Sequence, residues 1–70
     1  MILTNEEKLA VLDQHLKNVE YSIYGIELDL IEANSVSIQD ETLISGLNAR
    51  LDDQNAKKDA LLAEKATLTA

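Results

Sequence analysis

A heptad repeat of apolar residues runs without interruption through the first half of the 70-residue chain. With Leu9 taken as position a, apolar residues fill every a and d position of the repeat over this half. This pattern is typical of a long helix that packs against another helix along one side. The residues of this first seam are Leu9, Leu12, Leu16, Val19, Ile23, Ile26, Leu30 and Ala33.

The second half carries a weaker repeat with the same alternating spacing of three and four residues. The residues of this second seam are Ile44, Leu47, Leu51, Gln54, Lys58, Leu61, Lys65 and Leu68. Because the two seams supply equal numbers of layers, we expect the chain to fold back on itself and pair them. The sequence therefore predicts an all-α fold, an antiparallel two-helix hairpin (coiled coil). At 1.5 Å per residue its length would be roughly 45 Å.

Turn-favouring residues at 34–37 separate the two halves. We expect a single domain, residues 1–70, with one helix over about 4–33, a turn over about 34–37 and a second helix over about 38–67. Thr4 and Glu7 have the spacing of a capping box at the start of the first helix. Ser37 is the expected N-cap of the second helix, with Asp40 and Glu41 in its first turn.

Two lysines interrupt the second seam, and an acidic column beside the first seam can neutralise them. The column occupies the e positions Glu6, Asp13, Glu20 and Glu27. We expect Lys58 and Lys65 to lie along the seam by their aliphatic stems and to reach these carboxylates. On the other flank, Lys8 is expected to meet Glu64.

The outer side of the first helix is not plainly polar. Tyr21, Tyr24, Leu28 and Ile31, here called the outer patch, form a stripe about 140° from the seam at 100° per residue. Four large neighbouring side chains would make a contiguous exposed surface, which favours burial by another chain.

The second helix carries a stripe of small residues on its own outer side. Its members, here called the small stripe, include Gly46, Ala49, Ala56, Ala60 and Ala63. Small residues at this spacing allow another helix to approach closely, although alanine is also common on solvated helix faces. Gly25 and Gly46 fall at the same heptad position, c, where they indicate either close approach of a backbone or tolerated surface glycines.

A lone hairpin of this size would be marginally stable, because its apolar burial barely exceeds the entropy lost on ordering the chain. Together with the outer patch, this favours a homo-oligomer. We expect a dimeric four-helix bundle, with a trimer of hairpins as the next alternative. The candidate interface residues are those of the outer patch and the small stripe.

The net charge of −7 argues against nucleic acid and anionic membrane as partners. No apolar run is long enough to span a membrane, and the segment before Asn5 does not resemble a signal peptide. We therefore expect a cytoplasmic location. The chain has no cysteine, which excludes disulfides and thiolate metal sites.

Catalytic chemistry is not indicated by the sequence. His15 is the one histidine, and no carboxylate lies three or four residues from it to complete a metal site. No phosphate loop, nucleophile motif or calcium loop is present. We expect no cofactor and no enzymatic activity.

Three stretches of the first half resemble small uncharacterised proteins of marine tailed bacteriophages: residues 4–8, 19–24 and 27–34. The resemblance implies a phage-encoded protein located in the host cytoplasm or the virion, either a minor virion component or a host-directed binder. By architecture the chain is also similar to ROP, whose hairpins dimerise into a four-helix bundle, but ROP's RNA partner does not fit an acidic surface.

Two functions follow from these expectations. The first is a non-enzymatic structural or protein-interaction module that associates with itself. The alternative is a small acidic regulatory binder of a basic host protein, which requires the outer patch or the acidic column to stay exposed and its binding to be sensitive to salt.

Overall fold

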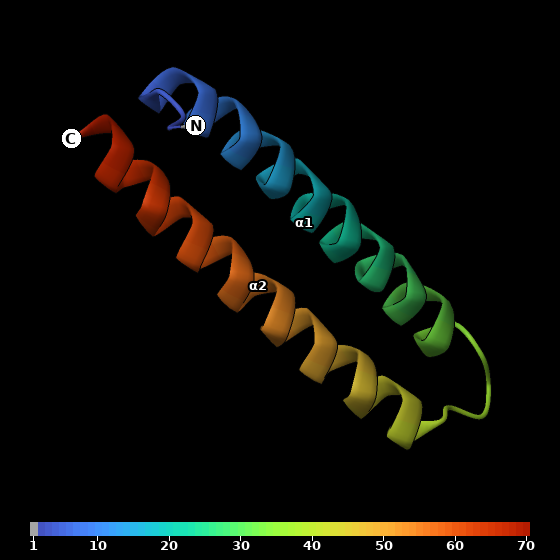
Figure 1. Ribbon diagram of the computed structural model, residues 1–70. Helices are drawn as coiled ribbons and strands as arrows, with labels where there is room; N and C mark the ends of the chain where they lie inside the picture. Colours follow the sequence, from blue (N-terminus) through green and yellow to red (C-terminus); the bar gives the residue numbers. More distant parts are fainter. Residues whose placement is uncertain (1) are drawn as a thin grey trace.

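The computed structural model describes residues 2–70 and consists of two long helices, α1 (Asn5–Asn34) and α2 (Glu41–Thr69). The helices run side by side in opposite directions and are joined at one end by a short connection (Figure 1). The resulting rod measures 54 × 20 × 14 Å. The predicted all-α hairpin is therefore confirmed.

The start of α1 is held by the predicted capping box. The Thr4 hydroxyl accepts a hydrogen bond from the Glu7 backbone N–H at 3.1 Å, and the Thr4 N–H donates to Glu7 Oε1 at 3.0 Å. These bonds satisfy donors that the first turn of a helix leaves unpaired. The backbone and side-chain hydrogen bonds from Thr4 also lower the pKa of Glu7, because they favour its charged form.

The connection between the helices satisfies carbonyl groups at the end of α1. The Asn34 side-chain amide donates to the Leu30 carbonyl at 2.8 Å, and the Ser35 hydroxyl donates to the Glu32 carbonyl at 2.7 Å. The Gln39 amide then returns to the Asn34 carbonyl at 3.1 Å. Many helices end in a glycine with positive φ, whose backbone conformation lets nearby N–H groups bond to the last carbonyl groups. Here side chains donate those hydrogen bonds instead, and none of the described residues has positive φ.

The second helix begins later than the sequence indicated. Asp40, not Ser37, is its N-cap, and the Asp40 carboxylate accepts a hydrogen bond from the Leu43 N–H at 3.1 Å. The prediction for Ser37 was wrong because both residue types cap helices well, and the choice depends on where the chain has crossed between the two helices. Residues 35–40 are used for that crossing, so the turn is longer than the expected 34–37.

We predict that Asp40→Ala lowers the free energy of unfolding by about 1 kcal/mol, because it leaves first-turn donors of α2 without a protein acceptor. The matched variant Ser37→Ala should change it by less than about 0.5 kcal/mol, because Ser37 is exposed in the connection. Urea titrations followed by circular dichroism measure both. Equal losses in the two variants would contradict the assignment of the cap.

The hydrophobic core is the single layer between the two seams. Among the described residues, the sixteen that are not fully exposed are the sixteen members of the two seams. Four of them are buried: Leu12, Leu16, Ile26 and Leu47. The heptad assignment is confirmed, and it leaves every other described side chain on the surface.

Candidate functional site

The hairpin has two broad faces, and different heptad positions flank the core on each of them. In an antiparallel pair of helices, the e positions of both helices lie along one face and the g positions lie along the other. The acidic column of α1 lies on the e side, which we call the paired face. The c and g positions of both helices make up the opposite side, which we call the grooved face.

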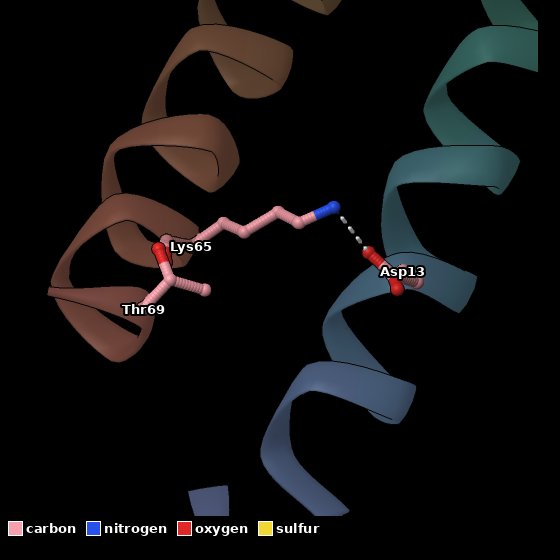
Figure 2. Close-up of polar contacts among 3 residues, drawn as sticks. All are labelled: Asp13, Lys65 and Thr69. Carbon is pink, nitrogen blue, oxygen red and sulfur yellow. Dashed lines mark hydrogen bonds and ion pairs between the residues drawn. The ribbon is translucent and has the colours of Figure 1, made fainter. Parts of the chain in front are cut away.

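The paired face is crossed by two ion pairs between the helices. Lys65 Nζ lies 3.0 Å from Asp13 Oδ1, and Lys58 Nζ lies 3.9 Å from Glu20 Oε1. Figure 2 shows the Lys65 side chain extended from α2 across to Asp13 on α1. Both predicted lysine contacts are confirmed. Since all four side chains are substantially exposed, each pair contributes at most about 1 kcal/mol to stability.

The third expected pair, between Lys8 and Glu64, does not form an ion pair in the part of the chain that the structure describes. Both side chains instead line a groove on the opposite face. The prediction rested on their shared flank position, which places the two residues near each other but does not bring their charged groups into contact.

At the turn end of the rod, the grooved face contains a depression of about 490 Å³, here called the turn-end groove. Leu43, Leu47 and Ala33 supply apolar walls, and the loop residues Val36 and Ile38 extend them. The charged residues along it are Asp29, Glu32, Asp40 and Arg50. The lining of this groove thus combines apolar side chains with charged ones, of which three in four are acidic.

A second depression of about 290 Å³, the open-end groove, lies on the same face near the chain termini. Its apolar lining includes Val11, Leu12, Leu61 and Leu68. Lys8, His15 and Glu64 contribute its polar groups. All its helical lining residues occupy c, d or g positions, as do those of the turn-end groove, so the two grooves share one face.

The outer patch is exposed in the hairpin, as its spacing from the seam requires. Tyr21 is 67% exposed, Ile31 is 65% exposed and Leu28 is 39% exposed. The Lys17 ammonium lies over the Tyr21 ring, 5.9 Å from its centroid, and borders the patch at one end. All four large side chains of the outer patch are therefore exposed in the hairpin.

The small stripe is also exposed, but it lies on a different edge of the rod. Its f positions point away from α1, whereas the f positions of the outer patch point away from α2. The structure thus does not bring the two predicted interface elements into one surface. A Cβ atom added at Gly25 or Gly46 would meet nothing within 4 Å, so neither glycine is required by contacts inside the hairpin.

The two grooves were not predicted from the sequence, although a signal for them exists. Val11 and Leu43 are apolar residues at flanking positions c and g, next to the d residues of the seam. Such residues widen the apolar surface on one side of a coiled coil beyond its narrow a/d stripe. The two sides of the seam therefore differ already in the sequence: apolar residues occur at c and g positions on the grooved face, whereas acidic residues fill the e positions of α1 from Glu6 to Glu27 on the paired face.

Among residues 2–70, no cluster of three or more His, Asp or Glu side chains is placed to hold a metal ion. Over the same residues, neither helix combines the length and the hydrophobicity that a membrane span requires. Comparison of the chain with models of protein families, with curated proteins and with solved structures gives no match.

Proposed function

We propose that the chain is a non-enzymatic, self-associating interaction module, a helical hairpin that buries an apolar outer surface against another copy. The observation that carries this proposal is the outer patch on α1. Large apolar side chains are spaced there in a row, with exposures of 39% at Leu28 and 67% at Tyr21. A surface of this kind on a small protein is typical of a protein–protein interface.

The thin core supports the same proposal. Four described residues are buried, and they form one layer between two helices. A hairpin with so little apolar burial gains stability when further apolar surface is removed from water. Contact between two outer patches is self-complementary, so it would close as a dimeric four-helix bundle.

Leu28→Glu tests the proposed interface, because it introduces a charge at the centre of the outer patch and leaves both seams intact. We expect self-association to weaken at least tenfold, since an ionised carboxylate would be desolvated without a partner. Sedimentation equilibrium of wild type and variant measures this change. The control Asp52→Glu retains the charge at an exposed site outside the patch and should not alter association.

Unchanged association of Leu28→Glu would exclude the outer patch as a self-interface. The patch would then be free for a foreign protein.

A second candidate function is supported by the acidic column. Glu6 and Glu27 form no ion pair among the described residues, so half of the column is available to a basic partner. The resemblance of the first half to small phage proteins is in keeping with a host-directed binder or a minor virion component. Binding through this column would weaken steeply with added salt, whereas burial of the outer patch would not.

A further inference from the structure

We propose that the hairpin opens at its connection into one continuous helix, and that two open chains pair in antiparallel orientation through the same two seams. Each α1 then packs against α2 of the other copy, with the contacts that it makes to its own α2 in the hairpin. Ser37 and Asp40, in the connection, hold the chain in its closed form. This inference concerns the seams and not the outer surfaces, so it does not depend on the outer patch being an interface.

The first argument is that the two seams share one heptad frame. Ile44 lies 35 residues after Leu9, which is five heptads, and Ser37 and Asp40 occupy the a and d positions of the heptad between the seams. A hairpin does not need this continuity, because its second helix starts again after the chain has reversed direction. A single helix does need it, since only then do both seams lie along one side.

The seams are also placed symmetrically about Ser37 and Asp40. Ala33, the last residue of the first seam, lies four residues before Ser37, and Ile44, the first residue of the second seam, lies four residues after Asp40. Two open helices can therefore pair antiparallel around a two-fold axis at this point and keep every layer of the hairpin. Ser37 and Asp40 of the two copies then form the centre of the pair.

The backbone of the connection is compatible with a helix. Residues 35–40 contain neither proline nor glycine, and none of the described residues has positive φ. Ser35 already has helical angles, φ −83° and ψ −13°. Opening replaces the side-chain hydrogen bonds of Asn34, Ser35 and Gln39 with the main-chain hydrogen bonds of a helix.

The balance between the two forms depends on the connection, since the contacts between the helices are the same in both. Joined by so short a connection, α2 is present near α1 at a millimolar effective concentration, so the wild type is expected to stay closed below about 1 mM. Asp40 favours the closed form in two ways. Its carboxylate caps α2 by accepting from the Leu43 N–H at 3.1 Å, and opening would bury the same carboxylate at the centre of the pair.

Energy transfer between two dyes on one chain tests the proposal, because opening separates the two helices of that chain. The chain has no cysteine of its own, so dyes can be attached at Gln14→Cys and Ala63→Cys, two exposed sites. In the hairpin these sites are separated by roughly the 20 Å width of the rod. In the open helix they are about 75 Å apart. A trace of labelled chain is refolded from urea with an excess of unlabelled chain, so that transfer is measured within single chains.

The variant Ser37→Leu/Asp40→Leu is expected to open at a concentration at least about a hundredfold lower than the matched variant Ser37→Ala/Asp40→Ala, because the leucines are buried at the centre of the open pair. Both variants lose the cap and the serine hydroxyl, and alanine is the better helix former. The difference between them therefore measures packing at the centre. The helical circular dichroism signal must be retained, which separates opening from unfolding.

The proposal is overturned if the leucine variant keeps high transfer up to about 1 mM, if the alanine variant opens at the same concentration as the leucine variant, or if the wild type is already open at about 10 µM. Transfer between singly labelled chains checks the orientation of the open pair. An antiparallel pair brings Gln14 of one copy close to Ala63 of the other, whereas a pair that brings Gln14 close to Gln14 would be parallel and would contradict the proposal.

The same measurements separate this proposal from the proposed function. Association through the outer patch leaves both helices of each chain together, so it does not lower transfer within a chain. Leu28→Glu lies outside both seams and should leave opening unchanged. If the leucine variant associates with high transfer and Leu28→Glu abolishes that association, the outer patch is the interface and opening does not occur. If it opens as expected and Leu28→Glu has no effect, the seams are exchanged between copies and the outer patch is not a self-interface.

Discussion

Ile26→Ala is expected to unfold most of the chain at room temperature. Ile26 is 4% exposed and is the most buried of the four core residues. Removing its side chain leaves a cavity beside the opposite helix, at a cost of about 2–5 kcal/mol. A single-layer hairpin has little more stability than that, so we expect loss of the helical circular dichroism signal and a large drop in the melting temperature.

The matched substitution for Ile26→Ala is Asp52→Ala, which lies on an exposed b position of α2. It should change the free energy of unfolding by less than about 0.5 kcal/mol. Similar melting curves for the two variants would mean that the seams do not hold the fold. The pair of measurements therefore separates stabilisation by the seam from general sensitivity to substitution.

Replacing both glycines by alanine is expected to stabilise the isolated hairpin by about 2 kcal/mol, about 1 kcal/mol at each site. Both glycines lie inside helices, and neither has any atom that an added methyl group would contact. Alanine lowers the conformational entropy of the unfolded chain relative to glycine and has a higher helix propensity. Because the added methyl group would meet no other atom, no steric cost offsets this gain within one hairpin. Thermal melts at concentrations below self-association measure the gain.

The reverse substitution Ala49→Gly provides the control for the glycine variants. Ala49 is exposed within α2, and its replacement should cost about 1 kcal/mol. If Gly46→Ala stabilises the dilute protein but weakens its association at higher concentration, the added methyl group stands between two copies. A loss of stability in the dilute protein would contradict the open surroundings of the glycines.

The packing of the helices could be predicted because the heptad pattern is a long-range signal. Each seam repeats over most of a helix, so one misplaced residue such as Gln54 or Lys58 does not obscure it. The charged residues that flank the seam follow the same period, which made the contacts of Lys58 and Lys65 predictable as well. Both outcomes depend on spacing along a helix and not on the details of the turn.

The start of α2 could not be fixed in the same way, because it depends on the path of the connection. Ser37 and Asp40 both suit an N-cap, and the difference between them is set by the hydrogen bonds of residues 34–39. The grooves were missed for a related reason. They arise from the shape of the surface between side chains, including loop residues Val36 and Ile38, which a one-dimensional pattern does not describe.

The two ion pairs of the paired face have a consequence for sliding of one helix along the other. Asp13 pairs with Lys65 and Glu20 pairs with Lys58, and both the acids and the lysines are separated by one heptad. A slip of seven residues would therefore give each lysine a new carboxylate from the same column, Glu6 or Glu27 included. The ion pairs could re-form after such a slip, but the apolar layers could not. A slip in one direction would place Ile26 opposite Gln54, and a slip in the other direction would leave no residues for the connection between the helices. Alignment of the helices thus rests on the aliphatic layers nearest the turn, and shortening or lengthening residues 35–40 would be the way to move it.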